Sequence, residues 1–125
     1  MTPSPGFSLL RKVLEFQRTT MAQTDFNSLD EIVVKIAEEV REIQETPPDS
    51  PEREEEVGDL FFACINLARW LKVDPETALQ RTFTKVRNRV AYIEGALAAQ
   101  GKTLKDVTFE EKEALWQESK KQPKA

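Results

Sequence analysis

The chain has 125 residues, a formal net charge of −4 and no histidine. This length suits one domain with a single core, and 32% charged against 39% hydrophobic residues is typical of exposed helices with narrow apolar stripes. The net negative charge argues against a nucleic-acid partner. The lack of histidine excludes catalytic triads with an imidazole base and the common zinc sites, so any catalysis must use carboxylates, lysine, arginine or a metal ion.

Five helices are predicted in chain order, and no segment indicates a strand. The first is expected over residues 7–21, where apolar residues recur at helical intervals. Ser28 followed by Glu31 has the spacing of a capping box, which starts a second helix. Pro47 and Pro48 end that helix near residue 46, because proline interrupts the backbone hydrogen bonds of a helix.

The three remaining helices are marked by their end residues. Ser50 suits the N-cap of a third helix that runs to about Leu71. Pro75 opens the fourth, and Gly101 ends it as a left-handed C-cap. Thr108 opens a short fifth helix that reaches Trp116. We therefore predict an all-α fold, a bundle of four to five helices, as a single domain over residues 1–125 with its core at about 7–118.

Two acidic pairs flank the apolar stripes of the second and third helices. The stripes predicted on the helical wheel consist of Leu29, Ile32, Val33, Ile36, Val40 and Ile43, and of Val57, Leu60, Phe61, Cys64, Ala68 and Leu71. Glu39 lies beside the first stripe with Glu42 one turn on, and Glu56 and Asp59 have matching places on the second. Antiparallel packing of the two helices brings the four carboxylates together.

Crowded carboxylates at the edge of a core are costly unless protons or cations neutralise them. Oxygen ligands suit Mg²⁺, with Mn²⁺ as a substitute, bound together with a phosphate substrate. The alternative is that these glutamate-rich helices are solvated surfaces.

The segments Glu38-Glu39-Val40-Arg41-Glu42 and Glu56-Val57-Gly58-Asp59 reproduce an EExxE motif followed by ExxD. Residues 59–69, residues 73–79 and the pair Leu115-Trp116 extend the match. In these segments the chain resembles the MazG family of nucleoside triphosphate pyrophosphohydrolases. The resemblance implies magnesium-dependent hydrolysis of NTPs or dNTPs to the monophosphate and pyrophosphate, by a homodimer or higher oligomer of helical bundles. It also implies that Glu39, Glu42, Glu56 and Asp59 are the metal ligands.

Further site residues follow with their alternatives. The resemblance implies that Lys85 and Arg89 face the substrate phosphates and that Trp116 borders the nucleotide, although basic pairs are commonly surface groups and a terminal tryptophan commonly docks its helix. Asn66 is a candidate to orient a ligand, the substrate or the catalytic base, with capping or a buried polar contact as the alternatives. The candidate catalytic base is Glu38 or one of the four ligand carboxylates, although the wheel directs Glu38 to solvent, where it could be an ordinary solvated helix residue.

Cys64 is a lone cysteine in an apolar run, so we expect it in the core of a protein from a reducing compartment. The N-terminus lacks a signal pattern, and no apolar stretch approaches the roughly 20 residues that span a bilayer. We expect a cytoplasmic protein without a membrane partner.

Two alternatives stay open at this point, and one prediction concerns oligomerisation. The substrate could be narrower, namely phosphoribosyl-ATP, dUTP or dCTP, or the chain could be a non-catalytic helical interaction module. Phe62 and Trp70 make the third helix apolar almost all round, which predicts that a homodimer completes the bundle.

Overall fold

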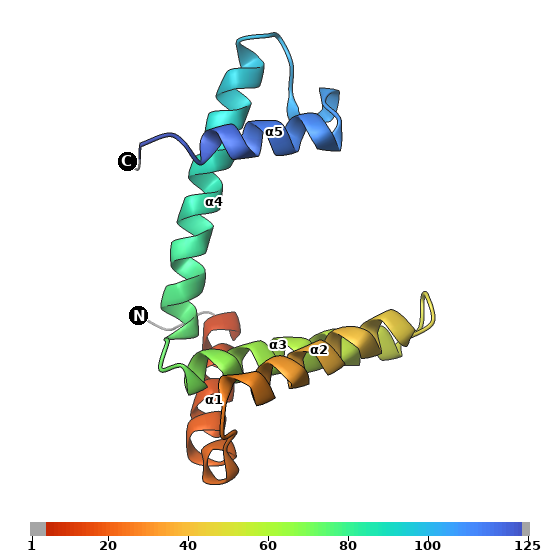
Figure 1. The fold of residues 1–125 in the computed structure, drawn as a ribbon, viewed down its shortest axis with the longest axis vertical. Helices are drawn as coiled ribbons and strands as arrows, with labels where there is room; N and C mark the ends of the chain where they lie inside the picture. Colours follow the sequence, from red (N-terminus) through yellow and green to blue (C-terminus); the bar gives the residue numbers. More distant parts are fainter. Residues whose placement is uncertain (1–4, 124–125) are drawn as a thin grey trace. The chain divides into compact units, whose positions relative to one another are not determined.

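The computed structural model describes residues 5–123, and side chains from residue 9 onward. This part of the chain forms five α-helices and two short 3₁₀ helices and contains no strand (Figure 1). The all-α prediction is confirmed. The elements are α1 (Pro5–Thr19), η1 (Met21–Thr24), α2 (Leu29–Glu45), α3 (Glu52–Trp70), α4 (Pro75–Ala98), η2 (Leu104–Asp106) and α5 (Phe109–Ser119). None of these described helices is both long and apolar enough to cross a membrane.

The caps predicted at the starts of α2 and α5 are present. The Ser28 hydroxyl accepts a hydrogen bond from the backbone N–H of Glu31 at 3.3 Å, and the Glu31 carboxylate accepts one from the backbone N–H of Asn27 at 3.0 Å. At α5, the Thr108 hydroxyl accepts from the backbone N–H of Glu111 at 3.1 Å. Both helices thus begin where side-chain oxygens satisfy free N–H groups of the first turn.

Gly101 ends α4 as predicted, with a φ of 71°. The N–H of Lys102 donates to the carbonyl of Leu97 at 2.9 Å, and the N–H of Gly101 donates to the carbonyl of Ala98 at 3.0 Å. These two bonds form a Schellman motif, which needs a left-handed residue at the glycine position.

Several helix boundaries differ from the prediction: α1 begins at Pro5 instead of residue 7, and α5 extends to Ser119 instead of Trp116. The backbone forms a 3₁₀ helix from Met21 onward, so α1 ends at Thr19 instead of residue 21. Helix α3 begins at Glu52 with Pro51 in the N-cap position, so the predicted Ser50 N-cap is wrong, although the Ser50 hydroxyl accepts a hydrogen bond from the Glu52 N–H at 3.2 Å. The 3₁₀ helix η2 was not predicted, and its start is fixed by a capping box between Thr103 and Asp106.

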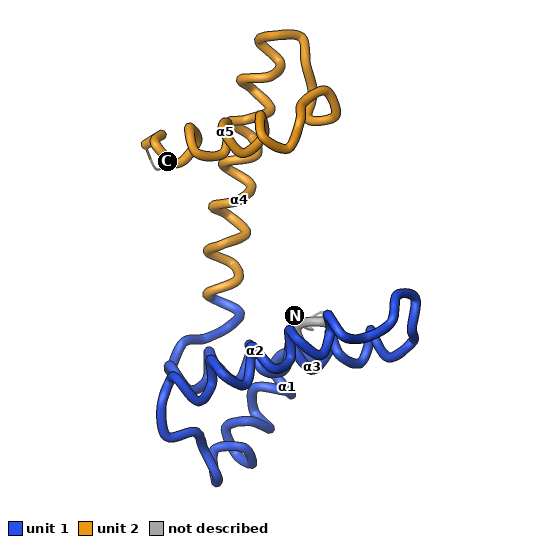
Figure 2. The backbone as a smooth tube through the Cα atoms, turned by 45° about the vertical axis from the view of Figure 1, so that its right-hand side comes forward, with its two compact units in different colours: residues 1–77 blue, residues 78–125 orange. Residues whose placement is uncertain are grey.

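The described residues divide into two compact units, with the division between Thr77 and Ala78 (Figure 2). In the first unit α2 and α3 run antiparallel side by side, and α1 packs on α3 (Figures 1 and 2). Leu14 and Ile32 are buried in this unit, and Ile93 is buried in the second. The predicted antiparallel hairpin of α2 and α3 is confirmed.

The apolar stripe predicted for α2 is only partly correct. Ile32 is buried and Ile36 is half-buried, but Val33 is 53% exposed and Val40 is 41% exposed. In the first unit α2 packs mainly against α3, and one partner helix covers a narrower face than the predicted stripe.

The inward face predicted for α3 is also wrong in part. Phe61 is 65% exposed and Cys64 is exposed, so Cys64 is not a core residue. Phe62 is half-buried and Asn66 is 6% exposed instead. A helix that is apolar almost all round does not specify its inward face by its own sequence, and the contacts with α1 and α2 select the face that carries Phe62 and Asn66.

Candidate metal centre

Four carboxylates gather where α2 lies against α3. Glu39 and Glu42 stand one turn apart on α2, and Glu56 and Asp59 stand one turn apart on α3. One carboxylate oxygen from each of the four residues lies within 4.8 Å of the others. The predicted convergence is therefore present, because the antiparallel hairpin sets the two i, i+3 pairs opposite each other.

Two oxygens of this cluster are buried without a hydrogen-bond donor. They are Oε2 of Glu39 and Oε2 of Glu56, and neither has a partner among the described residues. Glu39 is only 6% exposed, whereas Glu42 and Asp59 are exposed. Burying a carboxylate oxygen without a donor is costly, and a hard divalent cation supplies the missing partner to such oxygens. The donor set therefore fits Mg²⁺ or Mn²⁺, with its open side at the two exposed carboxylates.

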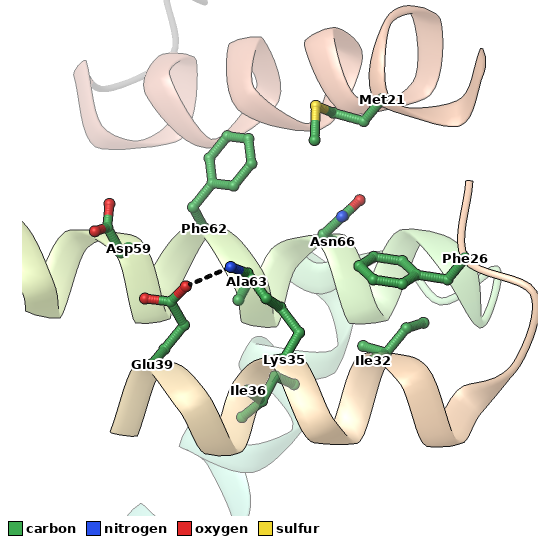
Figure 3. A pocket seen from close by; sticks show the side chains of 10 residues that line it. All are labelled: Met21, Phe26, Ile32, Lys35, Ile36, Glu39, Asp59, Phe62, Ala63 and Asn66. Atoms are coloured by element: carbon green, nitrogen blue, oxygen red, sulfur yellow. Dashed lines mark ion pairs between the residues drawn. The ribbon is translucent and has the colours of Figure 1, made fainter. Parts of the chain in front are cut away.

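The charges of the cluster are far from balanced. Lys35 Nζ lies 3.2 Å from Oε1 of Glu39, and this contact raises the pKa of Lys35 (Figure 3). Desolvation raises the pKa of Glu56 above its usual value, and the neighbouring Glu42, Asp59 and Glu39 carboxylates raise it further. One ammonium group offsets only part of the negative charge of four carboxylates, so a divalent cation is electrostatically favoured.

Lys35 was not among the predicted site residues. The only sequence signal was its i, i+4 spacing from Glu39, and such pairs are common on solvated helices.

A pocket of about 160 Å³ adjoins the cluster within the first unit (Figure 3). Its polar lining consists of Lys35, Glu39, Asp59 and Asn66. The rest of the lining is apolar, from Met21, Phe26, Ile32, Ile36, Phe62 and Ala63. Carboxylates and an ammonium group beside an apolar hollow suit a ligand with a charged part and a flat apolar part.

Asn66 takes part in a polar network that extends from the buried Asn66 to the exposed Asp25. Its Oδ1 accepts a hydrogen bond from Nε of Arg69 at 2.7 Å. The Arg69 guanidinium also forms a two-pronged ion pair with Asp25, at 3.0 Å from Nη1 and 2.7 Å from Nη2. Trp70 Nε1 donates to the carbonyl of Phe26 at 3.1 Å. These contacts attach the segment before α2 to α3, and they include the buried polar contact that was the alternative for Asn66.

Lys85, Arg89 and Trp116 belong to the second unit. Lys85 is exposed on α4, and the Arg89 guanidinium lies over the Trp116 ring, 5.3 Å from its centroid. Trp116 is half-buried, and this cation–π contact helps to dock α5 on α4. Glu38 is exposed, as the wheel predicted, and lies outside the carboxylate cluster. The catalytic and substrate-binding roles of these residues stay predictions.

Several known proteins are similar in sequence to this chain, although no family model matches it. The nucleoside triphosphate pyrophosphohydrolase/pyrophosphatase MazG of Thermotoga maritima is 33% identical over 116 residues, which is 93% of this chain and 44% of that protein. The nucleoside triphosphate pyrophosphohydrolase of Escherichia coli K12 is 37% identical over 102 residues, 78% of this chain and 39% of that protein. The chain belongs to the MazG family.

The sequence similarity covers only part of each relative. This MazG-family chain spans less than half the length of these two curated relatives. The uncharacterized protein YabN of Bacillus subtilis is 43% identical over 65 residues, which is 52% of this chain and 13% of that protein. The family assignment and the carboxylate cluster together indicate which reaction to test.

Proposed function

We propose that this chain catalyses the magnesium-dependent hydrolysis of nucleoside triphosphates, ribose or deoxyribose, to the monophosphate and pyrophosphate. The observation that carries the proposal is the cluster of four carboxylates in which Oε2 of Glu39 and Oε2 of Glu56 are buried without a donor. The names of the Thermotoga maritima and Escherichia coli relatives support the same reaction.

In this proposal Glu39, Glu42, Glu56 and Asp59 hold the metal. Bound magnesium supplies charge neutralisation for the triphosphate and increases the acidity of water, and Mn²⁺ is expected to substitute for it. Glu39 and Glu56 would hold the ion through their buried oxygens, and Glu42 and Asp59 would hold it through exposed carboxylates. Glu38, on the exposed side of α2, accepts the proton of the attacking water.

Cationic and polar side chains bind the rest of the substrate in the same proposal. Lys35, next to Glu39, adds positive charge beside the phosphates. Lys85 and Arg89 contact the phosphates, because cations at i and i+4 on one helix face can bind adjacent phosphoryl groups. Asn66 and Trp116 contact the nucleoside.

We further propose that residues 1–125 act as one catalytic domain in a cytoplasmic homodimer or higher homo-oligomer, without a nucleic-acid partner. Val33 on α2 and Phe61 on α3 are more than half exposed, and oligomerisation buries such residues. Light scattering at micromolar concentration tests this part, because a clean monomer contradicts it.

The decisive experiment is a pyrophosphate-release assay with all common NTPs and dNTPs, in magnesium and in EDTA. We expect release only with magnesium, and a loss of at least about 100-fold in kcat/KM for Glu39→Gln. Glu45→Gln is the matched control, because Glu45 is an exposed residue of α2 outside the cluster. Release that is equal in EDTA, or equal in the two variants, contradicts the proposed function.

A further inference from the structure

The direction of the Asn66 side-chain amide is fixed by its neighbour. Arg69 Nε donates to it at 2.7 Å, and a guanidinium has no acceptor atom. The atom that faces Arg69 must therefore be the amide oxygen, and Nδ2 must be on the other side. Asn66 is 6% exposed and lines the pocket, and Nδ2 has no hydrogen-bond partner among the described residues. A buried side chain that lines a hollow beside the carboxylate cluster thus carries an unused N–H donor (Figure 3).

Arg69 is itself held firmly. Its side chain is 7% exposed, and both terminal nitrogens contact the Asp25 carboxylate, at 3.0 and 2.7 Å. Rotation of the guanidinium away from Asn66 breaks this two-pronged pair, and a flip of the Asn66 amide places an N–H group against the N–H of Arg69. Both changes leave buried donors unpaired, so the network maintains the orientation of the amide.

We propose that Asn66 is a specificity residue whose side-chain NH₂ group donates a hydrogen bond to the nucleobase. The acceptor is a ring nitrogen or a carbonyl oxygen of the base. Arg69 and Asp25 are positioning residues that fix which end of the Asn66 amide is the oxygen and which is the NH₂ group. This inference rests on the proposed function, because the carboxylates at one side of the pocket assign the phosphates to that side. The apolar walls, which include Phe26 and Phe62, suit a flat ring. Bases are then discriminated by the acceptor that each places against Nδ2.

Asn66→Asp tests the polarity directly. Aspartate has nearly the same shape and keeps an acceptor for Arg69, but its ionised form has no donor for the pocket. For the preferred substrate we expect kcat/KM to fall about 10- to 100-fold, mainly through KM, and the spread of kcat/KM across bases to narrow. Arg69→Lys retains a charge for Asp25 but loses the planar fork, and we expect the same narrowing to a smaller extent. Gln44→Glu, an amide-to-carboxylate change at an exposed site on α2, is expected to leave the base profile unchanged.

A second readout does not need catalysis. In ¹⁵N-labelled wild-type protein the Asn66 side-chain NH₂ signals, assigned by their absence in Asn66→Asp, should shift on titration with nucleoside monophosphates in EDTA. Absence of a shift, together with an unchanged or uniformly reduced base profile in Asn66→Asp, overturns the inference even if the wild type releases pyrophosphate. A wild type that shows the shift but releases no pyrophosphate contradicts the proposed function and keeps the inference. If Asn66→Asp does not fold by circular dichroism, Asn66→Ser supplies the assignment, because it also lacks the side-chain amide, and Arg69→Lys decides the base profile.

Discussion

Replacing Glu39 by glutamine is expected to stabilise the metal-free protein. Glu39 is buried, and one of its oxygens lies within 4.8 Å of an oxygen from each of the three other carboxylates. At that distance two unit charges repel by about 3.5 kcal/mol at an effective dielectric constant of about 20, before screening by salt. The lost contact with Lys35, whose side chain is 50% exposed, costs at most about 1 kcal/mol. We expect a net gain of about 1 to 3 kcal/mol in the free energy of unfolding in EDTA.

Magnesium is expected to reduce the difference in stability between Glu39→Gln and the wild type. A ligand at 100 times its dissociation constant stabilises the folded state by about 2.7 kcal/mol, and the wild type should gain this amount. Glu39→Gln removes a ligand from the buried side of the site, so it should gain much less. With an affinity for the ion that is about 10- to 100-fold weaker, the lead of the variant in EDTA should shrink by about 1.4 to 2.7 kcal/mol in saturating magnesium.

Urea unfolding followed by circular dichroism, with and without magnesium at pH 7, measures both effects. Glu45→Gln is the control, and its stability should stay within about 0.5 kcal/mol of the wild type with a full response to magnesium. A Glu39→Gln variant that is less stable than the wild type in EDTA, or that gains as much from magnesium, refutes the electrostatic reasoning.

Three further predictions follow from individual contacts. The pKa of Glu56 is higher in the folded state than its unfolded value of 4.5, so the metal-free protein should lose stability as the pH rises from 4.5 through the folded-state pKa. Magnesium should remove this loss, which unfolding curves measured between pH 4 and 7 will show. Asp25→Asn should lower the free energy of unfolding by about 1 to 3 kcal/mol at pH 7. The hydrogen bond from Arg69 lowers the pKa of Asp25 in the folded state, so the stabilisation by the Asp25 carboxylate is present above the unfolded pKa of 3.8 and is lost as the pH falls through the folded-state pKa. A stability difference between variant and wild type that stays constant down to pH 2 would contradict this. Leu14→Ala should cost about 2 to 5 kcal/mol in urea unfolding, because Leu14 is 1% exposed in the first unit, and a cost below about 1 kcal/mol would show that this core is loosely packed.

Much of the fold could be predicted from local sequence. Ser28, Thr108 and Gly101 fix helix ends through bonds to residues three to five positions away, so their effect is visible in the sequence. The carboxylate cluster was predictable for a related reason. Glu39 and Glu56 flank apolar stripes on consecutive helices, and a short connection favours antiparallel packing.

The remaining features depend on contacts between distant segments. The pairing of Asp25 with Arg69 joins residues 44 positions apart, and no local pattern predicts it. Whether Phe61 or Phe62 of α3 turns inward is decided by α1 and α2, because the wheel of α3 has no clear polar side. The polarity of the Asn66 amide depends on Arg69 and becomes visible only in the folded molecule.

The most direct test of the carboxylate site is Mn²⁺ binding followed by the electron paramagnetic resonance signal of the free ion. We expect saturable binding to the wild-type protein, displacement by excess Mg²⁺, and an affinity about 10- to 100-fold weaker for Glu39→Gln but unchanged for Glu45→Gln. No binding by the wild type, or an equal loss in both variants, would contradict a metal site formed by Glu39, Glu42, Glu56 and Asp59.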